Sequence, residues 1–188
     1  MTLAIKGVMS DPADEVVEES EVADQHEPSP EDAAAQAHYE QLESKLRNGA
    51  NWFYWIAALS IVNSLILLAD GDSHFVVGLG LPQLVDGIAI EIGKQTPEIA
   101  GIAKVVAGIF TCFAASVFAV FGFGSRRRLT WVFICGMTLY ALDGLLLLVL
   151  QDWFSFGFHI FALFGIFGGF SASRELNALD LELADEGA

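Results

Sequence analysis

The feature that most constrains this chain is a series of apolar runs, each long enough to cross a lipid bilayer. Between residues 51 and 170 the sequence is rich in Phe, Leu, Ile, Val and Gly, and charged side chains are sparse. A hydrocarbon core about 30 Å thick is crossed by roughly 20 helical residues. Lipid offers no hydrogen-bond partner to a peptide backbone, so segments that cross it must be helical. The sequence therefore predicts an all-α integral membrane protein.

Four runs predict a four-transmembrane-helix bundle within residues 51–170. The predicted spans cover about residues 51–69, 97–123, 129–150 and 153–170. Thr96 is a candidate N-cap for the second span, with Pro97 at the first helical position and Glu98 in the first turn. This order is typical of a helix start, where a cap and a negative charge are favourable.

Residues 74–93 are apolar but interrupted, and we do not count them as a span. A helical projection places one set of apolar side chains on one face, with Gln83, Asp86 and Glu91 away from it; the set is Leu81, Leu84, Val85, Ile88 and Ile92. This pattern predicts an outer-side amphipathic helix opened by Pro82, either interfacial or re-entrant. A fifth complete span would place the triple-arginine turn outside, against the distribution of basic residues.

Basic residues near the span ends predict the orientation. They precede the first span, join the second to the third and follow the fourth: Lys45, Arg47, Arg126, Arg127, Arg128 and Arg174. Four spans place all six on one side, which the positive-inside rule makes the cytoplasm. We therefore expect a multi-pass protein of the plasma (inner) membrane, with the lipid bilayer as partner and both termini cytoplasmic.

Both ends of the chain are acidic. Of 24 acidic residues, 12 precede Lys45 and 5 follow Arg174, which accounts for most of the formal net charge of −15. Residues 1–32 carry too little apolar surface to fold, so we expect a disordered acidic cytoplasmic tail. Residues 171–188 form a second acidic cytoplasmic tail, with a helical stripe of leucines. A solvated tail is the simple interpretation, and docking to a protein partner is the alternative.

A short helix is predicted between the N-terminal tail and the first span. Residues 33–50 are rich in helix formers, and Tyr39, Leu42 and Leu46 recur at helical spacing. This spacing predicts a juxtamembrane amphipathic helix that leads into the membrane.

Four polar residues lie inside the predicted spans and are the candidate site. They are Asn63, Lys104, Asp143 and His159, one from each span. Counting along each helix places all four roughly 10 Å below the outer boundary. A charge in a span is costly, so we expect Lys104 to pair with Asp143, with His159 near the carboxylate. If Lys104 instead extends to the outer interface, Asp143 is left to His159.

Three interpretations of this polar layer stay open. A structural clasp that fixes helix register fits an accessory, scaffold or regulatory protein without enzymatic activity. The alternative is a small proton- or solute-linked transporter that uses the Asp, His and Lys side chains. An enzymatic interpretation rests only on Ser155, which lies one turn from His159 on the same predicted helix.

Composition argues against several other classes. Only 9 Lys and Arg residues are present, too few to predict a nucleic-acid partner. The histidines are scattered and predict neither a metal site nor a cofactor, and Cys112 and Cys135 are expected to pack as small apolar residues. Gly165 and Gly169 form a small-xxx-small pattern that predicts close helix packing within the chain, with a homo-oligomer as the alternative.

Overall fold

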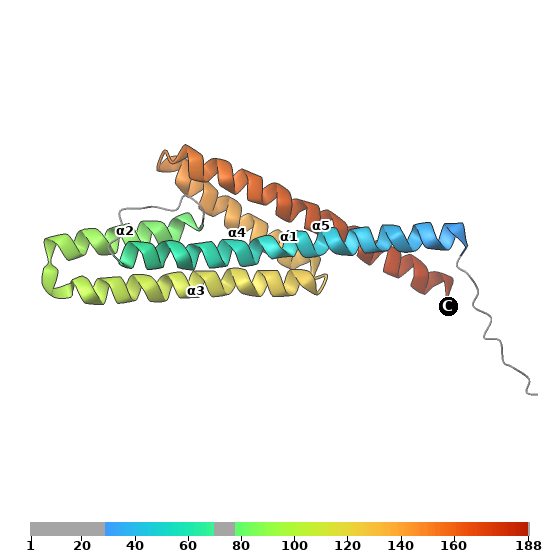
Figure 1. The fold of residues 1–188 in the computed structure, drawn as a ribbon, viewed down its shortest axis with the longest axis horizontal. Coiled ribbons are helices and arrows are strands. Elements are labelled where there is room, and N and C mark those ends of the chain that lie inside the picture. The colour runs from blue at the N-terminus through green and yellow to red at the C-terminus, as the bar shows by residue number, and fades with distance from the viewer. Residues whose placement is uncertain (1–28, 70–77, 188) are drawn as a thin grey trace, which may run out of the picture.

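The computed structural model describes residues 29–69 and 78–187, and every regular element in them is a helix (Figure 1). Residues 1–28 of the predicted disordered tail (1–32) and the start of the 74–93 segment lie outside the described residues, whereas residues 30–32 belong to the first turn of a helix. The helices are α1 (Pro30–Leu68), α2 (Gly80–Gln95), the short 3-10 turn η1 (Pro97–Ile99), α3 (Ala100–Arg126), α4 (Thr130–Val149) and α5 (Trp153–Glu186).

Three of these helical segments are long and apolar enough to span a membrane. They are Pro97–Arg126, Thr130–Val149 and Trp153–Asp185, and each buries only about a third or less of its most apolar stretch within the chain. Large apolar side chains therefore cover their outer surface, as expected for helices that face lipid. The structure thus supports an all-helical membrane protein with three candidate spans. The predicted first span lies in α1, which is not among the three.

The predicted juxtamembrane helix and the first predicted span form one continuous helix, α1, of 39 residues. The C-terminal tail likewise continues α5, which runs for 34 residues. The two extensions pack against each other beyond the bundle, at the right in Figure 1. Tyr39, Leu42 and Leu46 of α1 meet Leu176 and Leu179 of the predicted leucine stripe on α5, together with Ala172; Leu183 of that stripe is exposed.

Glycines bring α1 and α5 into close contact. A Cβ on Gly169 would lie 2.7 Å from Cα of Gly49, and a Cβ on Gly165 would collide with the Trp52 ring. The small-xxx-small pattern therefore serves packing within the chain at this crossing.

The face of α2 that is buried in the protein carries small and polar residues, and its apolar face is exposed. The helix begins at Gly80, two residues before Pro82. Leu81, Ile88 and Ile92 are exposed, whereas the Asp86 side chain is buried. The polar face that carries Asp86 therefore meets the protein and not water, while the interfacial or re-entrant position of the helix stays a prediction. The helix instead packs along α3 and α1, where its small and polar residues allow close approach, and it presents its apolar face outward.

The start of the second predicted span also differs in detail. Residues 97–99 form η1, and α3 begins at Ala100. Thr96 precedes this turn as predicted, but its side chain makes no capping hydrogen bond. The bend at η1 reverses the chain, so that α2 and α3 form a hairpin (Figure 1).

Candidate functional site at the start of α2

The Asp143 carboxylate of α4 holds the first turn of α2. It accepts hydrogen bonds from the backbone N–H groups of Gly80, at 2.7 Å, and Leu81, at 2.8 Å. The first N–H groups of a helix have no partner within the helix, and the helix dipole favours a negative charge there. Asp143 therefore caps α2 from a neighbouring helix.

A serine of α1 holds the residue before this turn. The backbone N–H of Leu79 donates to Oγ of Ser60 at 2.9 Å, and the Ser60 hydroxyl donates to the Ile56 carbonyl at 2.8 Å. Three successive amides, at residues 79, 80 and 81, thus bind side chains of α1 and α4. Gly80 allows this approach, since a Cβ there would lie 2.7 Å from the Leu147 side chain of α4.

His159 of α5 completes the carboxylate's contacts. Its Nε2 lies 2.9 Å from Oδ2 of Asp143, and its Nδ1 lies 2.8 Å from the Ser155 carbonyl oxygen. The ring is 1% exposed and stacks on Tyr140, with 4.2 Å between ring centroids. The site therefore joins α2, α4 and α5 through one carboxylate.

Both nitrogens of the His159 ring lie at hydrogen-bond distance from oxygen atoms, those of the Ser155 carbonyl and the Asp143 carboxyl group. The ring is therefore held in one orientation by its own helix and by α4.

The structure brings together two of the four predicted site residues. Asp143 and His159 are in contact as expected. The carboxyl group also contacts two α2 amides, in the place that the prediction gave to Lys104, which is half-buried on α3; the ion pair between Lys104 and Asp143 stays a prediction. Asn63 is buried on α1 beside the approach to α2, close to Gly78.

The amides of Gly80 and Leu81 and the Ser60 hydroxyl were not predicted from the sequence. Backbone donors carry no sequence signal of their own. The one local hint is the Gly-Leu-Gly-Leu-Pro run at residues 78–82, which marks a chain reversal or a helix start.

The contacts of Ser155 give no support to a serine nucleophile. Its hydroxyl donates to the Asp152 carboxylate at 2.5 Å, and its backbone N–H donates to the same side chain at 3.1 Å. Asp152 thus caps α5, and only the Ser155 carbonyl contacts His159. Within the described residues, no group of three or more His, Cys, Asp or Glu side chains is placed to hold a metal ion.

A second carboxylate is buried on α2. Asp86 is 1% exposed and lies next to Ser64 of α1. Neither of its oxygens has a hydrogen-bond partner among the described residues, and the Ser64 hydroxyl has none either. An ionised carboxylate in such surroundings is strongly disfavoured, so Asp86 contributes no stabilising contact comparable to those of Asp143.

An apolar groove borders the site. It has a volume of about 480 Å³ and lies between α2, α3 and α4. Its wall contains residues such as Phe110, Phe113 and Leu139, and Asp143 is the one polar side chain in that wall. Such a wall suits a hydrocarbon chain better than a polar solute.

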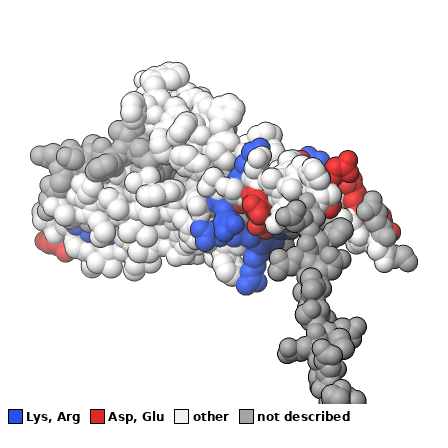
Figure 2. All heavy atoms as spheres, turned by 45° about the vertical axis from the view of Figure 1, so that its right-hand side comes forward, with Lys and Arg blue, Asp and Glu red and all other residues white. Residues whose placement is uncertain are grey.

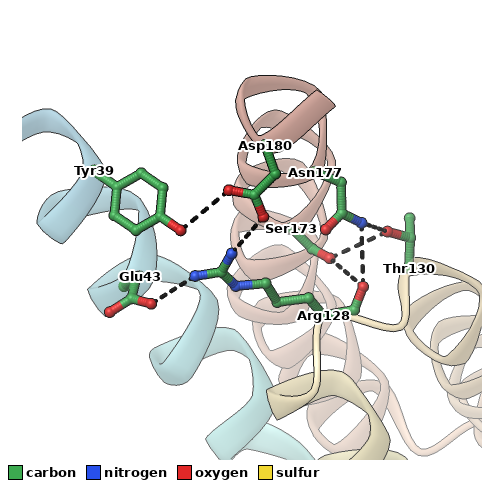
Figure 3. A network of polar contacts seen from close by, with 7 residues as sticks. All are labelled: Tyr39, Glu43, Arg128, Thr130, Ser173, Asn177 and Asp180. Carbon is green, nitrogen blue, oxygen red and sulfur yellow. Dashed lines mark hydrogen bonds and ion pairs between the residues drawn. The ribbon is translucent and has the colours of Figure 1, made fainter. Parts of the chain in front are cut away.

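At the other end of the bundle, Arg128 joins three parts of the chain (Figure 3). Its guanidinium donates to Glu43 of α1 at 2.7 Å and to Asp180 of α5 at 2.8 Å, and it lies over the Tyr39 ring. Its backbone carbonyl accepts a hydrogen bond from Asn177 at 3.2 Å. Partial burial lowers the pKa of the Arg128 guanidinium, but hydrogen bonds to Tyr39 and Glu43 outweigh this effect and raise it. The side chain is thus held as a cation between α1, α5 and the α3–α4 turn.

Comparison with known proteins gives no relative from which a function could be transferred: no family model, curated protein or solved structure matches the chain.

Proposed function

We propose that this chain is a small multi-pass membrane protein of accessory, scaffold or regulatory type, without enzymatic activity. The observation that carries this proposal is the use of Asp143. The carboxyl group has three hydrogen-bond contacts, all with groups of the same chain on α2 and α5. A carboxylate engaged in this way stabilises an arrangement of helices, and it offers little to a substrate.

The proposed topology has four spans, with α1 crossing beside α3 and α5 and with both termini in the cytoplasm. Figure 2 supports this placement, because the visible surface of the bundle is largely uncharged and basic side chains gather where the bundle meets the two helical extensions. In this topology α2 is re-entrant: it begins at the depth of Asp143 and runs outward to the turn at η1. The acidic extensions of α1 and α5 then lie in the cytoplasm, where a protein partner can bind them.

Single cysteines test this topology. In a chain with Cys112 and Cys135 replaced by alanine, we introduce a cysteine at Gln95 or at Glu182, both of which are exposed. An impermeant maleimide added to intact cells is expected to label the Gln95→Cys variant only, with Glu182→Cys labelled after lysis. Labelling of both variants from outside would contradict the four-span placement.

A proton-linked transporter is the second candidate, and the geometry of His159 favours it. His159 and Asp143 lie in contact, with 2.9 Å between Nε2 and Oδ2, inside two predicted spans. Intramembrane pairs of this kind occur in proton relays. The apolar groove next to Asp143 and its hydrogen bonds to the α2 amides argue for the structural role instead.

Reconstituted vesicles discriminate between the two functions. The structural role predicts that a pH gradient decays at the same rate in vesicles with wild-type protein, with Asp143→Asn and with no protein. A decay that requires wild-type protein and is lost in a folded Asp143→Asn variant would overturn the accessory function and establish proton transport. Folding of each variant is checked by its elution as a single species in detergent.

A further inference from the structure

A pocket of arginines lies at the end of the bundle where the basic residues gather. It has a volume of about 260 Å³ and is lined by Glu43, Leu46, Arg47, Arg126 and Arg128. These residues come from α1, from the end of α3 and from the turn that follows it. We propose that this pocket binds the phosphate group of an anionic phospholipid. The proposal rests on the membrane placement given above.

The three guanidinium groups are not equivalent. Arg128 is neutralised by Glu43 and Asp180. Arg47 is 3.8 Å from the other oxygen of Glu43, so one carboxylate serves two arginines. Three arginines and two carboxylates leave one positive charge in excess. The cluster is therefore suited to one further anion.

Arg126 carries the excess charge in a defined position. Its guanidinium donates to Oδ1 of Asn51 at 2.5 Å and lies over the Tyr54 ring, with 5.0 Å between Cζ and the ring centroid. Both of these partners are neutral, so they orient the group without compensating its charge. A guanidinium that is pre-oriented in this way loses little entropy when it binds a phosphate.

The surroundings favour a lipid phosphate over a soluble one. Arg126 is at the end of α3, and the exposed Trp55 and Phe123 side chains lie about one turn further into the bundle on α1 and α3. Aromatic residues of this kind mark the boundary between hydrocarbon and headgroups. Basic pockets on the cytoplasmic side of helical bundles match the phosphates of anionic lipids, whose acyl chains would pass over this apolar surface.

Lipid binding by the full-length protein in neutral detergent tests the proposal. Native mass spectrometry gives the apparent Kd for short-chain phosphatidylglycerol and for phosphatidylcholine of the same chain length. We expect phosphatidylglycerol to bind more tightly, and Arg126→Gln to weaken its binding about fivefold, the factor that corresponds to the loss of one basic residue near a lipid surface. Arg126→Lys keeps the charge and is expected to retain most of the affinity.

Arg174→Gln is the matched control. It removes the same charge from the same end of the molecule, but Arg174 lies over Phe170 on α5 and does not line the pocket. We expect its affinity for phosphatidylglycerol to stay within twofold of wild type. Equal losses in Arg126→Gln and Arg174→Gln, or equal binding of the two lipids by wild type, would overturn the proposal.

Two further measurements test whether something other than a lipid phosphate occupies the pocket. If inorganic phosphate displaces phosphatidylglycerol at similar concentrations, the site binds free phosphate and the lipid assignment is wrong. If phosphatidylglycerol binds only after deletion of residues 1–28, the acidic segment of the chain itself is the occupant and the lipid assignment again fails. Neither result affects the cysteine-labelling test. A failure of the proposed lipid site can therefore be distinguished from a failure of the proposed topology.

Discussion

Replacement of Gly169 by leucine is expected to destabilise the protein by at least about 3 kcal/mol, the upper end of the range for overpacked sites. The position has no room for a side chain, because a Cβ there meets the backbone of Gly49 at 2.7 Å. Backbone atoms cannot move aside as a flexible side chain can, so α1 and α5 must separate along their crossing. Thermal unfolding in detergent, followed by circular dichroism, measures the loss.

Gly168→Leu is the control for this prediction. It places the same side chain on the next residue of α5, where an added Cβ has no atom within 4 Å. Both variants remove one glycine from the same helix, so any effect of helix propensity cancels in the comparison. Similar midpoints for Gly168→Leu and Gly169→Leu would show that the close crossing of α1 and α5 is not required for stability.

Replacement of Asp143 by alanine is expected to cost about 2–6 kcal/mol, at about 1–3 kcal/mol for each of two buried partners, the Gly80 amide and the His159 ring, that lose a hydrogen bond. The variant leaves the amides of Gly80 and Leu81 and the His159 ring without their acceptor. Gly80 and His159 are buried, so no solvent replaces the lost contact at these two positions. Chemical denaturation in detergent measures the loss, and hydrogen exchange at residues 80 and 81 is expected to become faster than at the middle of α3.

Asp86→Asn is the matched control, because Asp86 is a second aspartate buried at the same end of the bundle. Its carboxylate oxygens lack hydrogen-bond partners among the described residues, so loss of the acidic group removes no such contact. We expect this variant to be as stable as wild type or more stable. A larger loss in Asp86→Asn than in Asp143→Ala would show that the wrong carboxylate has been assigned as the clasp.

The helices of this protein could be predicted from the sequence because their signals are local. Apolar runs between 97 and 170 predicted α3 and α4 close to their observed bounds and the start of α5, and the leucine stripe around Leu42 and Leu46 identified the face that packs on α5. The continuity of α1 and α5 was not predicted: no proline lies near residues 50 or 170, yet the change in composition there suggested separate segments.

The candidate site was predicted only in part. The equal depth of Asp143 and His159 was enough to predict their contact, because the two residues lie on adjacent helices of one hairpin. Depth does not give the rotation of a helix about its axis, so it could not decide whether Lys104 faces Asp143. The partners that Asp143 has on α2 are backbone amides, which any residue type provides. The inward position of Asp86 was missed for a related reason, since an amphipathic pattern does not say which of its faces meets the protein when the surroundings are lipid.

The unbroken course of α1 has a mechanical consequence. At about 1.5 Å per residue, its 39 residues form a rod of about 58 Å. Ser60 near one end binds the approach to α2, while Tyr39 and Glu43 near the other end contact Arg128. A rod without a hinge converts a small tilt at one end into a larger displacement at the other. In the proposed topology, a partner that tilts the Tyr39 end of α1 would therefore also move Ser60 and the approach to α2.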